Sequence, residues 1–264
     1  MIGYWADLPS SAFRDLDGAQ AVAILPLGAI EQHGPHLPLA TDRDLVDAVL
    51  QRALARLAAA PPPWSVLVLP TLAVTKSNEH GAFPGTLSLS AATLLQVLHE
   101  IAASVARAGV RRLLLFNGHG GNVAVLEVAA RDARALGLIT ASASWFQMCG
   151  AEQLLDARER QHGIHAGLNE TSAMLATRPG LVTLALAHGQ RSASEDWAER
   201  YRHLGLAGRA VRPGWLMHEL NPSGVAGDAG AATAELGEHL LEHAAAALAE
   251  ALAEFVAFDP GGAP

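Results

Sequence analysis

Short apolar runs alternate with longer segments of helical spacing along most of this chain. Each run is bounded by turn residues and is too short for a helix, which is typical of buried strands in a parallel sheet. The runs cover residues 21–27, 65–69, 112–116 and 139–145. Helices are expected over residues 44–59, 90–108, 122–136, 169–176 and 231–255. This alternation predicts an α/β fold, with three α/β/α layers around a mostly parallel central sheet.

Composition narrows the class of protein. The chain has 264 residues, of which 50% are hydrophobic, so it can bury one large core, and we expect one domain over residues 1–264. The formal charge is −8 without a basic cluster, which argues against a nucleic-acid partner. The single cysteine, Cys149, favours a reducing compartment. No segment resembles a signal peptide or a membrane span, so we expect a cytoplasmic protein without a membrane partner.

The segment that follows the first predicted strand is dense in metal-ligand side chains. Glu31, His33, His36 and Asp42 lie within twelve residues that also contain two prolines. Oxygen and nitrogen donors on a loop of limited backbone freedom are what a metal site requires. The segment therefore predicts one half of a metal site, and other parts of the chain must supply the second half.

Three further segments of this kind follow the later strands. Because the carboxyl ends of parallel strands meet at one edge of a sheet, we expect these side chains to share one polar site. The segments are Glu79-His80 before Gly-Ala-Phe-Pro-Gly-Thr, the loop Asn117-Gly118-His119-Gly120-Gly121-Asn122, and His165-Ala-Gly-Leu-Asn-Glu170-Thr-Ser.

These four segments resemble the signature blocks of the creatininase (creatinine amidohydrolase) family. They stand in family order with similar spacing, and the segment Gly224-Val-Ala-Gly-Asp228 is similar too, so the resemblance covers almost the full chain. It implies a metal-dependent amidohydrolase with a three-layer α/β/α fold. It also implies two divalent ions per chain, zinc first with manganese or iron as alternatives, and a homohexamer.

The resemblance implies ligand roles residue by residue. Glu31 and His33 would each ligate one metal, Asp42 would bridge the two, and His119 would join Glu31. Creatininases carry Tyr and a ligating Glu where this chain has Gly120 and Gly121. We therefore expect Glu170 to complete the second metal site. The Gly-Gly loop and the Glu79-His80 pair are closer to the deformylase and mycofactocin-peptidase branches than to creatininase itself.

The expected reaction is hydrolysis of a C–N bond in a small molecule. Two divalent ions can activate a water and polarise a carbonyl, and an imidazole can protonate the leaving nitrogen. His165 is the candidate acid, the alternative being a helix-terminal histidine with a local hydrogen bond. Glu79, His80, Asn117 and Gly120 would contact substrate or orient the ligands. For Asn117 the second role is favoured, because it would fix the loop that contains Gly120. Pocket walls are expected from residues 145–165 and 192–215, and residues 192–212 resemble an insertion or a lid.

The substrate class stays open at this point. A cyclic amide or a formamide is the first prediction, and a short peptide, as in the mycofactocin-peptidase branch, is the alternative. A non-catalytic oligomeric scaffold is another alternative. A dinucleotide site is disfavoured because Val123 stands where the third glycine of such a loop is needed.

Overall fold

A five-stranded parallel sheet forms the centre of the computed structural model, which describes residues 1–261. The spatial order of its strands is β1-β3-β2-β4-β5, and every neighbouring pair is parallel. The strands are β1 (Ile2–Tyr4), β2 (Ala21–Leu27), β3 (Ser65–Val68), β4 (Arg112–Asn117) and β5 (Ile139–Ser144). The predicted α/β fold is confirmed.

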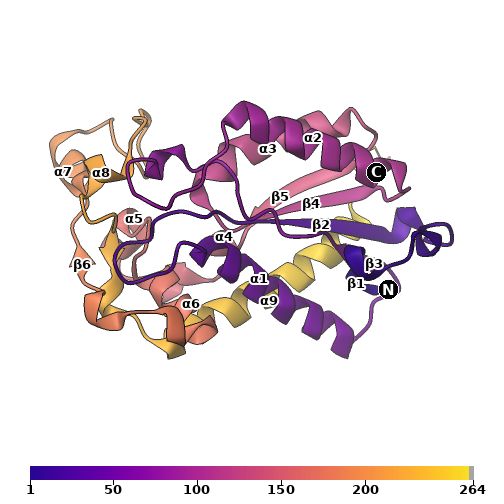
Figure 1. The fold of residues 1–264 in the computed structure, drawn as a ribbon, viewed down its shortest axis with the longest axis horizontal. Helices are drawn as coiled ribbons and strands as arrows, with labels where there is room; N and C mark the ends of the chain where they lie inside the picture. The colour runs from indigo at the N-terminus through magenta and orange to yellow at the C-terminus, as the bar shows by residue number, and fades with distance from the viewer. Residues whose placement is uncertain (262–264) are drawn as a thin grey trace.

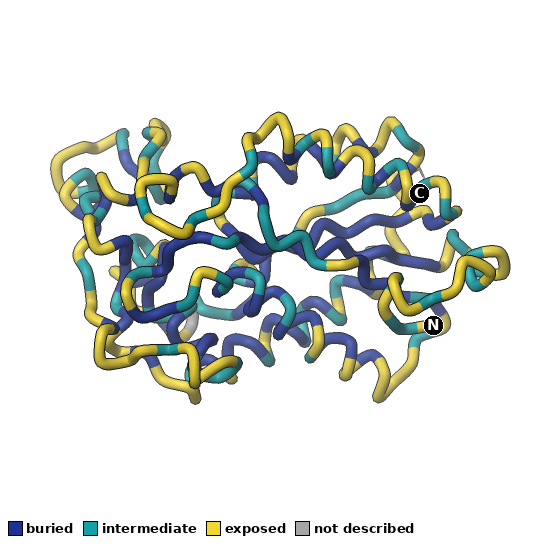
Figure 2. Tube along the Cα trace, viewed as in Figure 1, coloured by how far each residue is buried: buried dark blue, intermediate teal, exposed yellow. Residues whose placement is uncertain are grey.

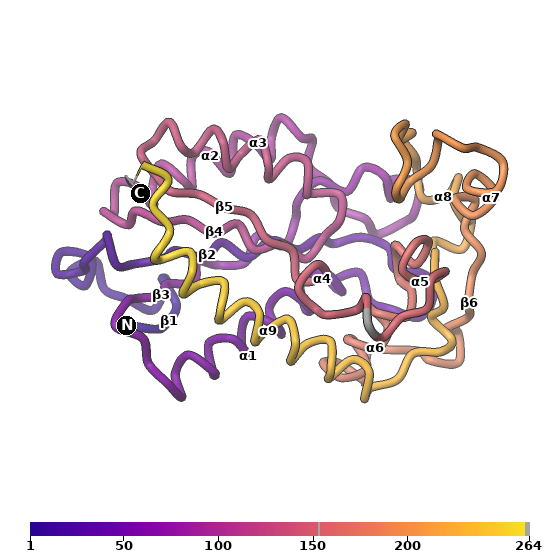
Figure 3. Tube along the Cα trace, turned by 180° about the vertical axis from the view of Figure 1, so that it is seen from behind, coloured from indigo at the N-terminus to yellow at the C-terminus, as the bar shows by residue number. Residues whose placement is uncertain are grey.

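Helices cover both faces of this sheet (Figures 1 and 3). One face carries α2 (Ala91–Arg107) and α3 (Val123–Arg134), and the other carries α1 (Thr41–Ala59), α6 (Leu168–Thr177) and α9 (Ala234–Ala257). The molecule therefore has the three layers that the sequence predicts. No helix in residues 1–261 combines the length and the apolarity needed to cross a bilayer.

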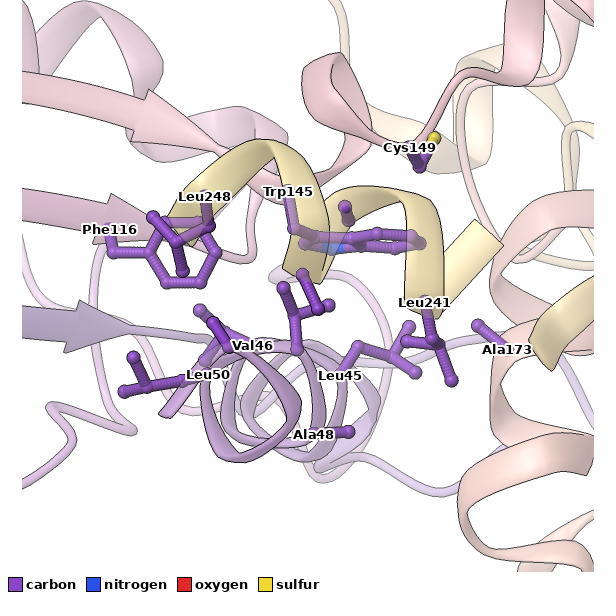
Figure 4. Close-up of a cluster of buried hydrophobic side chains, with 14 of the residues drawn as sticks. Leu45, Val46, Ala48, Leu50, Phe116, Trp145, Cys149, Ala173, Leu241 and Leu248 are labelled. Atoms are coloured by element: carbon purple, nitrogen blue, oxygen red, sulfur yellow. The ribbon is translucent and has the colours of Figure 1, made fainter. Parts of the chain in front are cut away.

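Two hydrophobic cores lie on opposite sides of the sheet because successive strand residues point to opposite faces. In β4, Leu114 and Phe116 join the core under α1 and α9, whereas Leu113 and Leu115 join the core under α2 and α3. Figure 4 shows the first core, in which Trp145 lies near Phe116 and residues of α9. The central strands β3, β2 and β4 are buried along most of their length, whereas the edge strands β1 and β5 are partly exposed, as are the outer helix faces (Figure 2).

The predicted helix boundaries agree with the structure to within two residues, except where the first and last helices begin. The last helix was predicted to begin at residue 231, and α9 begins at Ala234. Ser90 caps α2 by accepting a hydrogen bond from Thr93 N at 3.1 Å, as expected of an N-cap serine. The predicted start of the first helix at residue 44 is wrong, because Thr41 already begins α1 and Asp44 N donates to Ala40 O at 2.9 Å. Asp42 therefore lies on the first turn of a buried helix and not in the preceding loop.

Short elements at the carboxyl end of the sheet were not predicted (Figure 1). They follow β5 and gather around the loops that leave the strands. Residues 192–212, predicted as an insertion or a lid, begin with a helix whose capping box joins Ser192 and Glu195. The elements are α4 (Trp145–Met148), α5 (Ala157–His162), α7 (Ala193–Arg200), α8 (Met217–Leu220) and the antiparallel pair β6 (Gly189–Gln190) and β7 (Gly227–Asp228).

Candidate metal centre

Glu31, in the loop that follows β2, lies at the centre of the predicted site and is fully buried. The Ser77 hydroxyl donates to its Oε2 atom. Its Oε1 atom accepts no hydrogen bond within residues 1–261, although three imidazole nitrogens surround it. These are His119 Nδ1 at 3.2 Å, His80 Nε2 at 3.5 Å and His165 Nδ1 at 3.7 Å. A buried carboxylate oxygen without a hydrogen donor is a candidate cation ligand.

Asp42 connects two groups of potential ligands through its two carboxylate oxygens. Oδ1 lies 3.2 Å from His33 Nε2, and Oδ2 lies 3.3 Å from His119 Nδ1. Glu170 Oε2 lies 3.9 Å from the same His33 nitrogen. One ligand atom each from Glu31, Asp42 and His119 can lie within 4.8 Å of the others, and the same holds for His33, Asp42 and Glu170. The structure thus brings together all five residues predicted as ligands.

The charges in this cluster are unbalanced without cations. Burial lowers the pKa of His33, but the charges of Asp42, Glu170 and Glu31 outweigh burial and raise that pKa to about 10. Burial also opposes the shift at His119, yet the carboxylates of Glu31 and Asp42 beside it hold its pKa well above the usual value. The imidazoles therefore retain protons in the positions that divalent cations would occupy, and the donor set fits two such ions.

Glu79 lies beside the edge of the His119 ring that points away from the cluster. Its Oε1 is 3.3 Å from His119 Nε2, and Lys76 Nζ donates to its Oε2 at 2.7 Å. Burial alone would raise the pKa of Glu79, but His119 and Lys76 lower it to about 2. A Cβ atom on Gly121 would overlap both Glu79 Oε1 and His119 Nε2. This contact supports the alternative in which Glu79 orients a ligand.

Gln32 was missed by the sequence analysis although it stands between two predicted ligands. Its side-chain NH₂ group is 2.8 Å from His80 Nδ1 and 3.1 Å from Gly224 O, which accounts for both of its hydrogens. His165 Nε2 lies 2.7 Å from the backbone carbonyl of Gln32, which can only accept. The proton of a neutral His165 ring is therefore on Nε2, and its Nδ1 lone pair faces the cluster.

The His165 ring is held within a stack of imidazoles. Its centroid lies 4.3 Å from that of His33 and 4.2 Å from that of His80. Burial, followed by the charges of His33 and His80, holds its pKa well below the usual value. Glu31, His33 and His165 also form a third group with metal-ligand spacing, so the geometry permits a ligand role beside the predicted catalytic role.

A strained residue separates His165 from Glu170. Ala166 has a φ of +51°, which L-amino acids other than Asn and Asp seldom adopt, and its backbone N–H donates to Glu170 Oε2 at 2.6 Å. An isolated antiparallel bridge fixes the start of this turn, because His165 and Ala226 exchange backbone hydrogen bonds of 3.2 and 2.9 Å. The turn thus brings the imidazole and the carboxylate to the same cluster.

Buried Glu159 braces this turn and was also missed, because it lies in a polar segment without a motif. Its carboxylate accepts from the backbone N–H groups of Leu168 and Asp228, both at 2.8 Å. Burial raises its pKa, and these hydrogen bonds only partly offset the rise. Side chains would collide with this carboxylate at Gly163, Gly167 and Gly227.

The remaining predicted residues occupy distinct positions. Asn117 is fully buried, and its amide donates to His119 O at 2.8 Å, so it fixes the loop as expected. Gly120 lines the cavity beside the cluster. His36, in the motif that first indicated metal binding, lies away from the cluster with its Nε2 atom 2.9 Å from Thr171 Oγ1.

A cavity of about 300 Å³ opens next to the cluster. Glu31, His119, His165 and Glu170 form part of its lining. The prediction that residues 192–215 supply a wall is confirmed, whereas residues 145–165 contribute only Ile164 and His165 among the described residues. The wall from the later segment consists of Leu206, Ala207, Arg212, Pro213 and Trp215.

The sequence matches a family model described as "Creatininase: Creatinine amidohydrolase" over residues 6–252. The chain belongs to the creatininase family. A mycofactocin precursor peptide peptidase of Mycobacterium ulcerans (strain Agy99) is 35% identical over 240 residues, which cover 89% of this chain and 85% of the relative. A creatinine amidohydrolase of Pseudomonas putida is 36% identical over 184 residues, or 62% of this chain and 66% of that protein.

Solved structures agree with the assignment to the creatininase family. A crystal structure of creatinine amidohydrolase (creatininase) superposes with a TM-score of 0.75 and 27% identity, covering 97% of this chain and 98% of that one. This creatininase-family chain is thus a hydrolase of C–N bonds, with a cluster of potential metal ligands at the carboxyl end of its sheet.

Proposed function

We propose that this chain is a dinuclear amidohydrolase in which Asp42 is shared between two divalent ions. Glu31 and His119 would hold one ion with Asp42, and His33 and Glu170 would hold the other. The observation that carries the proposal is the placement of the two Asp42 oxygens, each facing a different imidazole at 3.2 and 3.3 Å. Glu31 Oε1 and Asp42 Oδ2 support it, because both are buried without a hydrogen-bond donor within residues 1–261.

Different groups of the proposed site would serve different steps of amide hydrolysis. Divalent ions, when bound, supply a Lewis acid for the carbonyl and lower the pKa of the attacking water. His165 Nδ1 takes the proton of that water, because hydrogen bonding to the Gln32 carbonyl leaves its lone pair toward the cluster. The same imidazole then delivers the proton to the departing nitrogen, so that water adds across the C–N bond and yields an acid and an amine.

Between the two substrate classes left open by the sequence, specific observations favour a peptide-like amide. Gly120 and Gly121 leave the cavity without the bulky side chains that creatininases carry in this loop. The relative named as a peptide peptidase also aligns over 89% of this chain, against 62% for the creatinine amidohydrolase. Cyclic amides and formamides remain the other candidates, and the same assay tests them.

The identity of the metal belongs to this proposal as well. Zinc is the first expectation, with manganese or iron as alternatives, because histidine and carboxylate ligands suit all three. Two solved creatininases, one described as a manganese form and the other as a Zn–Zn type, are each 27% identical to this chain with a TM-score of 0.74. A homohexamer and a cytoplasmic location stay predictions, testable by light scattering and by cell fractionation.

The proposal is tested by metal analysis together with a substrate panel. Purified protein reconstituted with zinc, manganese or iron should bind about two ions per chain. It should hydrolyse short peptides faster than creatinine or a simple formamide. Protein that binds no ion after reconstitution would overturn the enzyme proposal and favour the non-catalytic scaffold. Faster turnover of creatinine than of peptides would overturn the substrate class alone.

A further inference from the structure

Arg212 brings a positive charge to a cavity that is otherwise acidic. Glu31, Glu79 and Glu170 all line this cavity, and Arg212 is its only lysine or arginine among the residues described. The metal cluster explains the acidic residues, but it does not explain an arginine in the same cavity.

The guanidinium of Arg212 is available for a ligand. Its Nε atom donates to Leu206 O at 3.0 Å, and within residues 1–261 its two terminal nitrogens form neither a hydrogen bond nor an ion pair. Other arginines of the same region are engaged: Arg191 binds Asp196, and Arg158 binds Glu195. A guanidinium presents two parallel N–H groups that match a carboxylate, so a free one beside a reactive site is a candidate anion anchor.

The backbone around Arg212 is held by hydrogen bonds of its own. Val211 N donates to His203 O at 2.9 Å, and Gly205 N donates to Val211 O at 3.1 Å, which closes the loop that ends at Arg212. Arg209 Nη1 fastens this loop to Arg202 O at 2.7 Å. The loop therefore presents Arg212 from a defined position on the cavity wall.

Apolar side chains form the cavity wall next to this charge. Trp215 stands with its ring perpendicular to that of His80, with centroids 6.5 Å apart, and joins a small hydrophobic cluster with Leu206. Ile164 is 38% exposed at the cavity. A ligand that matched both the Arg212 guanidinium and this apolar wall would carry a carboxylate next to an apolar side chain.

We propose that Arg212 binds a carboxylate of the substrate, so that this enzyme prefers amides whose apolar residue ends in a free carboxylate, such as N-acyl amino acids and peptides with a free C-terminus. The inference rests on the proposed amidohydrolase function and adds the substrate class to it. Arg212 would hold the carboxylate while the amide carbonyl lies at the metal cluster, and Trp215 and Ile164 would contact the apolar side chain.

Paired probes test this anchor in the metal-loaded enzyme. N-Formylphenylalanine and glycyl-valyl-phenylalanine are compared with their C-terminal amides, which are isosteric but uncharged. Arg212→Gln should raise KM for the two acids by about 10- to 100-fold, the size of a charge-assisted hydrogen-bonded pair, and change KM little for the amides. Arg202→Gln is the matched control, because Arg202 is exposed in the same region and does not line the cavity.

Binding of N-acetylphenylalanine, followed by calorimetry, provides a readout that does not require turnover. Weaker binding in Arg212→Gln but not in Arg202→Gln supports the anchor even if no probe is hydrolysed, in which case the amidohydrolase proposal fails alone. Hydrolysis of acids and amides with equal kcat/KM overturns the anchor and leaves the amidohydrolase proposal standing. Binding that is unchanged in Arg212→Gln also overturns the anchor, because the carboxylate is then held by a group other than Arg212.

Discussion

The carboxylate of Glu79 occupies the space that a side chain on Gly121 would need. Glycine at this position lets Glu79 reach the outer nitrogen of His119, while the inner nitrogen of that ring faces Glu31 and Asp42. The resemblance to creatininases implies a ligating glutamate in this loop, whereas here the space holds the Glu79 carboxylate, which contacts the candidate ligand His119. We therefore propose that the substitution changes how the site is supported and that Glu170 supplies the carboxylate that the loop lacks.

Gly121→Ala should weaken metal binding by about 10- to 100-fold, the usual effect of losing a partner that orients a ligand. The added Cβ would displace Glu79 from His119. Glu79→Ala should have a similar or smaller effect, and the double variant should be no worse than Gly121→Ala alone, because the Cβ that displaces His119 already removes its contact with Glu79. Gly120→Ala is the control for metal affinity, since a Cβ there meets nothing within 4 Å. Additive losses in the double variant would contradict this account.

Asp42→Ala should remove both metals and abolish hydrolysis, because the two ligand groups share this carboxylate. Asp44, two residues later in the first turn of α1, pairs with Arg178 Nη1 at 3.5 Å and does not face the cluster. Asp44→Ala should keep both metals and lower the free energy of unfolding by about 1 kcal/mol, as expected for a carboxylate in a first helical turn. Metal content and denaturant unfolding measure the two effects, and equal metal loss in both variants would show that the shared ligand is misplaced.

Glu170→Gln should lose one metal selectively and retain about one ion per chain. Glutamine preserves the volume and can still accept the hydrogen bond from Ala166 N, but it removes the charge that a divalent ion requires in a buried site. Metal titration at equilibrium distinguishes the two sites. Two tightly bound ions in this variant would mean that another residue completes the second group.

His165→Ala should retain both metals and lower kcat by about 10²- to 10⁴-fold, the usual contribution of proton transfer by a positioned side chain. The loss should be smaller for substrates whose leaving nitrogen is a weak base, because that nitrogen needs less protonation. Rates are compared across leaving groups at matched metal content. A loss of metal would instead assign His165 to the ligand group with Glu31 and His33.

Metal-free protein should lose stability as the pH rises from about 7 to about 10. The folded-state pKa of His33 is raised from 6.5 to about 10, so its stabilising contribution is complete below pH 6.5 and is lost as the pH rises through 10. The folded-state pKa of Glu170 is raised from 4.5 to about 7, so its contribution to stability is likewise lost as the pH rises from 4.5 to about 7. The metal-loaded protein should show no such loss, because its ligands are already deprotonated. Denaturant unfolding of both forms across this range provides the measurement.

The layers of the fold were predictable because they depend on local patterns. The apolar run Ala21–Leu27 and the apolar stripe of α2 each indicate burial from a short stretch of sequence alone. The three-residue strand β1 was not predictable, because so short a segment carries no periodicity and owes its conformation to pairing with β3. Likewise, α7 lies in a polar segment whose helical signal is a capping box and not an apolar stripe.

Some residues of the candidate site were likewise predictable from local sequence, and others were not. Glu31, His33 and His119 were predictable because ligands at strand ends converge on one edge of a parallel sheet. Gln32 and Arg212 were not, because their roles depend on neighbours that are distant in sequence or on a cavity that only the fold creates. The contact between Gln32 and Gly224, 192 residues apart, leaves no local signature.

That same contact makes the completed site depend on the last part of the sequence. The loop after β2 reaches its final arrangement only when Gly224 and Ala226 have been synthesised and have docked beside Gln32 and His165. Contacts across so long a stretch of chain cost loop-closure entropy before they stabilise the fold. A chain shortened before residue 224 would therefore keep all five candidate ligands in its sequence but lose the hydrogen bonds that hold the side chain of Gln32 and the backbone of His165.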